Sequence, residues 1–76
     1  MTKALLIHAS EEAAEFTQAA MKLARGDWGK KELTKEAADM AAFLLVMRKQ
    51  RKINRALFKK RRAKKLKKMQ RKYGNS

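Results

Sequence analysis

Apolar residues recur at spacings of three and four along the first third of the chain. From Lys3 to Arg25 the sequence has no Gly or Pro and is rich in Ala, Leu, Glu, Gln and Lys, which favour helices. The pattern predicts an amphipathic helix over 3–25, and Gly26 after Lys22 and Arg25 is a typical helix stop. The expected apolar face consists of Leu5, Leu6, Ala9, Ala13, Phe16, Ala20 and Leu23.

A second helix is predicted to begin at Glu32 or Leu33, after a tight loop over 26–29. Every residue from Met40 to Met47 is apolar, so this helix would be apolar on all sides there. One neighbouring helix cannot cover such a surface, which predicts a dimer or higher oligomer with this helix near its centre. Its core-facing positions are expected to be Leu33, Ala37, Met40, Ala41, Leu44 and Met47.

The segment 48–73 has no helix breaker before Gly74, and its composition favours a further helix. Its apolar residues change face, because Ile53 and Leu57 fall roughly opposite the stripe of the second helix. A bend near 48–54 and another near 59–62 would reconcile the two faces. Alternatively, the end of this segment has no packed partner and orders only on binding.

Charge divides the chain into two parts. Residues 1–47 hold six Lys and Arg and all seven acids, a net of −1, whereas residues 48–76 hold fifteen Lys and Arg and no acid, a net of +15. We therefore expect a helical hairpin over 1–47 and a basic extension over 48–76. The chain has no cysteine, which excludes disulfides and thiolate metal sites. Its longest apolar run is too short to span a membrane, and no signal peptide is recognisable, so a cytoplasmic location is expected.

Five of the acids form two short motifs. Glu11, Glu12 and Glu15 form E-E-x-x-E, which on a helix spans about 100° of arc, so the three carboxylates share one sector. Glu36 and Asp39 form E-x-x-D, one turn apart on the second helix. If the two helices pack antiparallel, all five carboxylates converge, and carboxylate oxygens are the ligands that Mg²⁺ or Mn²⁺ prefers. Alternatively, these acids only complement the helix dipole and solvate the surface.

Three neighbouring residues also have two interpretations each. His8 shares the sector of Glu11 and Glu15, and is either a further ligand or a surface or packing residue. Lys22 lies two turns beyond Glu15, and either meets a phosphate or pairs with polar neighbours on its own helix. Trp28 in the loop either stacks on a nucleotide base or packs over the helix junction.

The two motifs and the residues around them resemble the MazG-like group of all-α nucleotide pyrophosphohydrolases. The segments 11–26 and 33–40 look like the two motif helices of phage-encoded members, and the spacer of twenty residues between Glu15 and Glu36 lies within the family's usual range. The resemblance covers about 4–47. It implies a phage-type hydrolase of the host cytoplasm, which uses Mg²⁺ to convert a nucleoside triphosphate to a monophosphate and pyrophosphate, and whose hairpins pair into four-helix bundles as homodimers or homotetramers.

The resemblance also implies roles for individual residues. Metal ligands would be Glu11, Glu12, Glu15, Glu36 and Asp39. The catalytic base would be Glu12 or Glu15, and the substrate phosphates would meet Lys22 and Arg25.

The basic extension predicts a second kind of partner. Its cations surround the predicted helix, which argues against a membrane-surface helix, and they suit non-specific RNA, DNA or ribosome binding. The alternatives are a solvated tail without a partner and contact with a triphosphate across the oligomer. The second functional hypothesis is a non-catalytic MazG-like module that binds nucleic acid or a protein through this tail. Its candidate residues are Arg48, Lys49, Arg51, Lys52, Arg55, Lys59, Lys60, Arg61, Arg62, Lys64 and Lys65.

Overall fold

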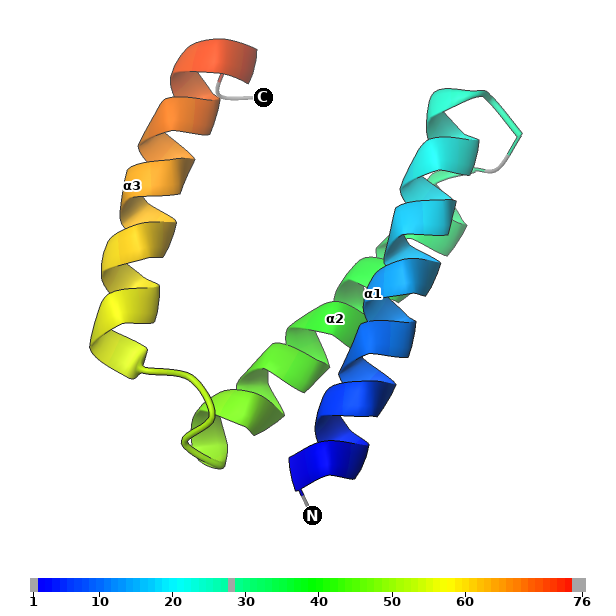
Figure 1. Ribbon diagram of the computed structural model, residues 1–76. Helices are drawn as coiled ribbons and strands as arrows, with labels where there is room; N and C mark the ends of the chain where they lie inside the picture. The colour runs from blue at the N-terminus through cyan, green and yellow to red at the C-terminus, as the bar shows by residue number, and fades with distance from the viewer. Residues whose placement is uncertain (1, 28, 75–76) are drawn as a thin grey trace. The chain divides into compact units, whose positions relative to one another are not determined.

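The computed structural model describes residues 2–27 and 29–74, which form three helices and no strand (Figure 1). Helix α1 spans Thr2–Ala24, α2 spans Lys30–Lys49 and α3 spans Arg55–Tyr73. The all-α class predicted from the sequence is confirmed. Within the described ranges, no helix is both long enough and apolar enough to cross a bilayer.

The chain forms two compact units, one ending at Val46 and the other beginning at Met47. This boundary falls one residue before the position at which the charge composition changes. The first unit holds α1 and most of α2, and the second holds the end of α2 and all of α3.

In the first unit, α1 and α2 pack as an antiparallel hairpin (Figure 1). The end of α1 is fixed by two backbone hydrogen bonds, from the amide of Asp27 to the carbonyl of Lys22 at 2.9 Å and from that of Gly26 to Leu23 at 3.0 Å. This pair is the Schellman motif, and it requires a left-handed residue, which Gly26 supplies with φ of 84°. The predicted glycine stop is confirmed, whereas Trp28, and with it both of its interpretations, lies outside the described residues.

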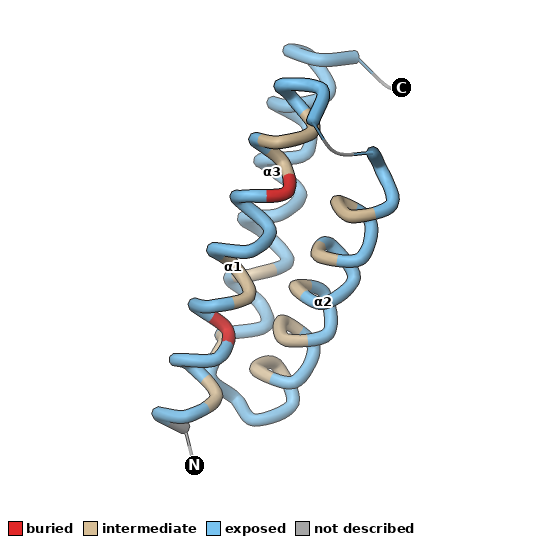
Figure 2. Tube along the Cα trace, turned by 90° about the vertical axis from the view of Figure 1, so that its right-hand side faces the viewer, coloured by how far each residue is buried: buried red, intermediate tan, exposed pale blue. Residues whose placement is uncertain are grey.

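The core of the hairpin is thin. Among the described residues only Ala9 and Ala19 of α1 are buried, with 8% and 0% of their surface exposed. The half-buried positions of α2 face α1 (Figure 2). Small residues on α1 therefore let the second helix approach closely, but they leave little apolar surface to be buried.

The predicted apolar stripes are partly correct. Leu33, Met40, Leu44 and Met47 are half-buried as expected, whereas Ala37 and Ala41 are exposed. Glu36 and Phe43, which were not part of the predicted stripe, are half-buried as well. On α1, Leu6 and Phe16 were expected to face the core but are exposed.

The second unit begins with another Schellman turn. At the end of α2, the amide of Lys52 donates to the carbonyl of Met47 at 2.9 Å, and that of Arg51 donates to Arg48 at 3.1 Å. The left-handed position is held by Arg51, with φ of 58°, where a glycine is usual. The bend predicted near 48–54 is therefore confirmed.

Helix α3 begins at a well-formed N-cap and runs without a break. The side chain of Asn54 accepts a hydrogen bond from the amide of Leu57 at 3.0 Å. The second bend, predicted near 59–62, is wrong. That prediction assumed that the apolar residues of this segment need a common packed face, yet in α3 only Phe58 is even half-buried. The positions of the apolar residues around α3 therefore do not require the helix to bend.

Candidate metal centre

Three carboxylates from two helices meet on the packed side of the hairpin. Glu12 and Glu15 of α1 and Glu36 of α2 each offer an oxygen, and these oxygens all lie within 4.8 Å of one another. Glu12 and Glu15 are about one turn apart on α1. Glu36 reaches them because it is one of the half-buried positions of α2, and its oxygen lies within the same 4.8 Å limit. The convergence depends on the rotation of α2, which leaves Glu36 half-buried and Ala37 exposed.

Two of these carboxylates are partly removed from water. The side chain of Glu12 is only 15% exposed. Its Oε2 and the Oε2 of Glu36 are buried, and neither has a hydrogen-bond partner among the described residues. Burying an acceptor without a donor is unfavourable, and more so when the acceptor is charged. The hairpin thus holds two carboxylate oxygens in an environment that a cation would improve.

The pKa shifts of the cluster also indicate a site that a cation would stabilise. Burial raises the pKa of Glu12 above its ordinary value of 4.5, and the charges of Glu15 and Asp39 raise it further, while His8 acts in the opposite direction. Burial is also the main cause that raises the pKa of Glu36, followed by Glu15 and then by Asp39 and Glu12. Burial and the neighbouring negative charges therefore raise the pKa of Glu12 and of Glu36, which hold protons more readily than isolated glutamates do.

His8 lies beside the cluster. Its Nε2 is 3.6 Å from Oε1 of Glu12, one turn away on α1, and its side chain is 60% exposed. Its ring meets Phe43 of α2 edge-on, with 4.7 Å between the ring centroids. His8 is therefore an exposed side chain that contacts Phe43 and lies beside Glu12, which agrees with its interpretation as a surface or packing residue. Its role as a metal ligand stays a prediction.

The remaining predicted site residues lie around this trio. Asp39 is exposed, but near enough for its charge to raise the pKa of Glu12 and of Glu36. Glu11 is exposed and does not belong to the trio. At the far end of α1, Lys22 is half-buried and Arg25 pairs through its Nε with Oδ2 of Asp27 at 3.2 Å. Phosphate contacts by these two cations stay predictions.

The donor set fits a hard divalent cation. Three carboxylates can supply oxygen ligands of the kind that Mg²⁺ and Mn²⁺ take, and the positive charge would offset their mutual repulsion. The two buried oxygens without donors would then gain a favourable partner. A divalent cation held by such a centre would act as a Lewis acid and lower the pKa of a bound water.

Sequence reasoning missed a second feature, around Phe58 in the unit that begins at Met47. The guanidinium of Arg48 lies 5.5 Å from the centre of the Phe58 ring, and that of Arg62 lies 5.4 Å from it. These side chains line a hollow of about 450 Å³ together with Arg55, Ala56 and Lys59. The sequence signal was an aromatic residue, Phe58, within a run of cations.

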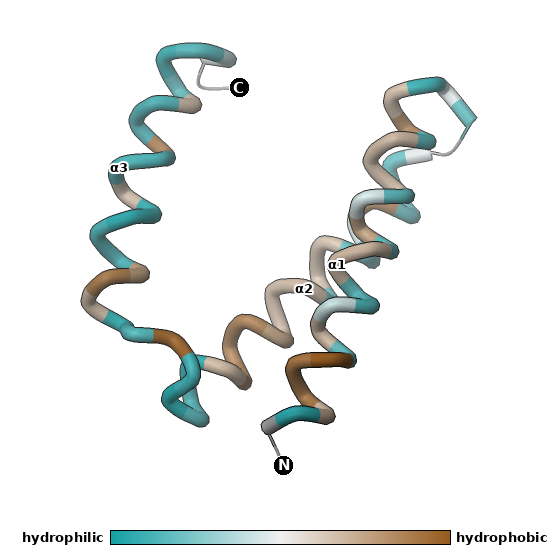
Figure 3. The backbone as a smooth tube through the Cα atoms, viewed as in Figure 1, coloured by the Kyte–Doolittle hydropathy of each residue, from teal (hydrophilic) through white to brown (hydrophobic). Residues whose placement is uncertain are grey.

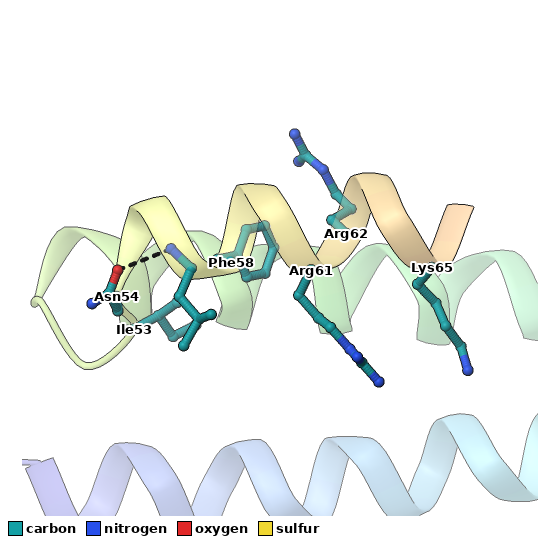
Figure 4. A pocket seen from close by; sticks show the side chains of 7 residues that line it. Ile53, Asn54, Phe58, Arg61, Arg62 and Lys65 are labelled. Atoms are coloured by element: carbon teal, nitrogen blue, oxygen red, sulfur yellow. Dashed lines mark hydrogen bonds between the residues drawn. The ribbon is translucent and has the colours of Figure 1, made fainter. Parts of the chain in front are cut away.

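A second hollow, of about 500 Å³, lies along Ile53, Leu57 and Phe58 and is bordered by cations (Figure 4). In this view Arg61 and Lys65 point to one side of α3, and Arg62 points to the opposite side. Phe58 therefore separates an apolar groove from a basic hollow.

Comparison with protein-family models, curated proteins and solved structures gave no significant match.

Proposed function

We propose that the hairpin is a Mg²⁺- or Mn²⁺-dependent nucleoside triphosphate pyrophosphohydrolase of the MazG-like type. It would hydrolyse a nucleoside triphosphate to the monophosphate and pyrophosphate. The observation that carries the proposal is the convergence of Glu12, Glu15 and Glu36, with two buried carboxylate oxygens that lack donors. The resemblance of the E-E-x-x-E and E-x-x-D motifs supports the choice of reaction.

The carboxylates would have two roles, metal binding and proton transfer. Glu15, Glu36 and Asp39 would hold the cation, which supplies charge neutralisation at the phosphates and activation of a bound water. Glu12 would accept the proton of the attacking water, because it lies in the cluster with Glu15 and Glu36 and its buried oxygen has no donor among the described residues. His8, paired with the other oxygen of Glu12, would orient that carboxylate.

The proposal includes a four-helix bundle made of two hairpins. Support comes from large apolar side chains that one hairpin leaves in water. Figure 3 shows the hydropathy of each described residue along the backbone. These side chains are Leu6, Ile7, Met21, Leu45 and Val46, exposed by 38% to 54%. Such a surface on so small a unit is typical of an interface between chains. Sedimentation should detect a dimer or tetramer, and Leu45→Glu should dissociate it. A monomeric wild-type protein would refute this part.

The activity is tested by pyrophosphate release from the common and modified nucleoside triphosphates, with Mg²⁺ and with chelator. We expect release only with the metal, and its loss in Glu12→Gln and Asp39→Asn. The matched control is Glu32→Gln, which removes an acid one turn from Glu36 that is not part of the cluster. Failure to release pyrophosphate from any nucleotide would overturn the proposal.

A second candidate function is nucleic-acid binding by residues 48–76. The observation that favours it is α3, where eleven of nineteen residues are Lys or Arg and none is acidic. Every cation of α3 is exposed. Such a helix would bind phosphates with little sequence preference, and its affinity would fall steeply with salt.

This second function is separable from the first. For RNA binding by the full chain, the logarithm of the association constant should fall linearly with the logarithm of the salt concentration. On single-stranded RNA the slope should steepen by about 0.7 for each cation that contacts a phosphate. Glu12→Gln should leave that binding unchanged, because Glu12 lies in the hairpin and not in the basic unit. Binding that is absent at low salt, or insensitive to salt, would exclude it.

A further inference from the structure

We propose that the turn between α2 and α3 is a phosphate-binding site, built from Arg48, Arg55, Lys59 and Arg62 around the ring of Phe58. The hollow that these residues line, which we call the basic elbow, has a volume of about 450 Å³. The inference deepens the nucleic-acid-binding candidate and rests on it. It does not depend on the carboxylate site.

Phe58 brings two of these cations together. The guanidinium groups of Arg48, in the last turn of α2, and Arg62, in the second turn of α3, lie 5.5 and 5.4 Å from its ring centre. Guanidinium groups are attracted to aromatic faces, so the ring positions both side chains, and both line the same hollow. Like charges that line one hollow repel each other, and an anion bound in the hollow would offset that repulsion.

The elbow lacks an internal anion. Residues 48–76 contain no Asp or Glu, so no carboxylate of this segment can neutralise the four cations. The Nε of Arg48 is also buried, and it has no hydrogen-bond acceptor in the part of the chain that the structure describes. A planar guanidinium with a free donor is the group that proteins use to bind phosphate oxygens in pairs.

The first turn of α3 adds to this positive environment. Arg55 and Ala56 are the first two residues of the helix and both line the elbow. The amide of Leu57 is already taken by the side chain of Asn54, which fixes the start of the helix beside the cations. The helix dipole places partial positive charge at this end, where an anion is stabilised.

The elbow should therefore bind one phosphate group more tightly than the rest of α3 does. The other cations of α3 do not line this hollow, so they would give binding without a defined position. The phosphate could belong to the backbone of a nucleic acid or to a free polyphosphate, and the chemistry at the elbow is the same for both.

The test compares two double variants of the full chain that each remove two arginine charges. Arg48→Gln with Arg62→Gln removes the two guanidinium groups beside Phe58 from the elbow. Arg61→Gln with Arg71→Gln is the matched control, because neither arginine lines the elbow and Arg61 points away from Arg62 (Figure 4). Binding is measured at one salt concentration for two probes, a single-stranded RNA long enough to cover α3 and inorganic tripolyphosphate.

We expect the elbow variant to bind at least one probe about tenfold more weakly than the control variant does, because it loses charge-assisted hydrogen bonds and not only net charge. Loss on RNA alone assigns the phosphate to a nucleic acid, and loss on tripolyphosphate alone assigns it to a free polyphosphate. In the wild type, tripolyphosphate or RNA should shift the Arg48 Nε–H resonance more than that of Arg61.

Equal losses in the two double variants would overturn the elbow while leaving nucleic-acid binding intact. No binding of either probe by the wild type would overturn both. If circular dichroism shows that the glutamine variant has lost helix, Arg48→Lys with Arg62→Lys decides the question. That variant keeps both charges and lacks only the guanidinium fork, so it should still bind more weakly than Arg61→Lys with Arg71→Lys.

Discussion

Glu12 of α1 and Glu36 of α2 direct carboxylates at one another across the hairpin, and each has one buried oxygen that no donor in the described part of the chain satisfies. Both positions lie on the packed faces of their helices, where an apolar side chain would stabilise the pair. The hairpin therefore has a feature that weakens its fold in the absence of a cation. Such an arrangement is typical of a functional site, where residues needed for function lower the stability of the fold.

The first prediction concerns pH. The pKa of Glu36 is raised in the folded hairpin, so below its ordinary value of 4.5 the carboxyl is protonated in both states and its burial costs least. As pH rises, the unfolded chain ionises first, and stability is lost as pH passes through the raised folded pKa. Without divalent cations, Glu36→Gln should raise the melting temperature by a few degrees at neutral pH and leave it nearly unchanged in acid.

Circular dichroism melts across pH measure this effect, and Glu32→Gln on the same helix is the control for a general loss of negative charge. If Glu32→Gln raises the melting temperature at neutral pH as much as Glu36→Gln does, the loss of negative charge explains the increase. Burial of the Glu36 carboxylate then does not.

The second prediction concerns metal. Cations bind the ionised carboxylates and compete with protons, so Mg²⁺ or Mn²⁺ should raise the melting temperature more at about pH 8 than at about pH 5. Glu36→Gln removes a ligand and should abolish the shift, whereas Glu32→Gln should keep it. An equal metal shift in wild type and Glu36→Gln would place any bound cation elsewhere.

The sequence was sufficient for the helices and for the residue types of the site, because both depend on local pattern. It was not sufficient for the precise inward face of α2. Ala37 and Glu36 are neighbours on the helix, and periodicity favours the apolar one, yet Glu36 faces α1. A small difference in helix rotation decides between them, and that rotation is set by packing across the hairpin.

The same limit applies to the basic elbow. Arg48 and Arg62 could be recognised as two of fifteen cations, but their meeting at Phe58 depends on the turn between the helices. That turn contains a left-handed arginine at position 51. A left-handed conformation at an arginine could not be predicted from the sequence, since glycine is the usual residue at this position of the turn.

The third prediction concerns the N-cap of α3. Asn54→Ala removes the acceptor for the amide of Leu57 and should destabilise the start of the helix by about 1 kcal/mol. Hydrogen exchange of the Leu57 amide should accelerate, and the Cα shifts of the first turn should move toward coil values. Asn54→Asp should restore the cap, because aspartate accepts the same bond and its charge suits the helix dipole. Unchanged exchange in the alanine variant would contradict the assigned cap.

The last prediction concerns Arg51, which holds φ of 58° in the turn that closes α2. A left-handed conformation costs a residue with a Cβ about 1–2 kcal/mol, and glycine avoids this cost at the expense of greater freedom when unfolded. Arg51→Gly should therefore stabilise the turn and slow exchange of the Lys52 amide, which donates to Met47, by about threefold. Arg51→Ala is the control, since it removes the same charge and keeps the Cβ. If alanine slows exchange as much as glycine does, relief of charge repulsion explains the gain and the backbone conformation does not.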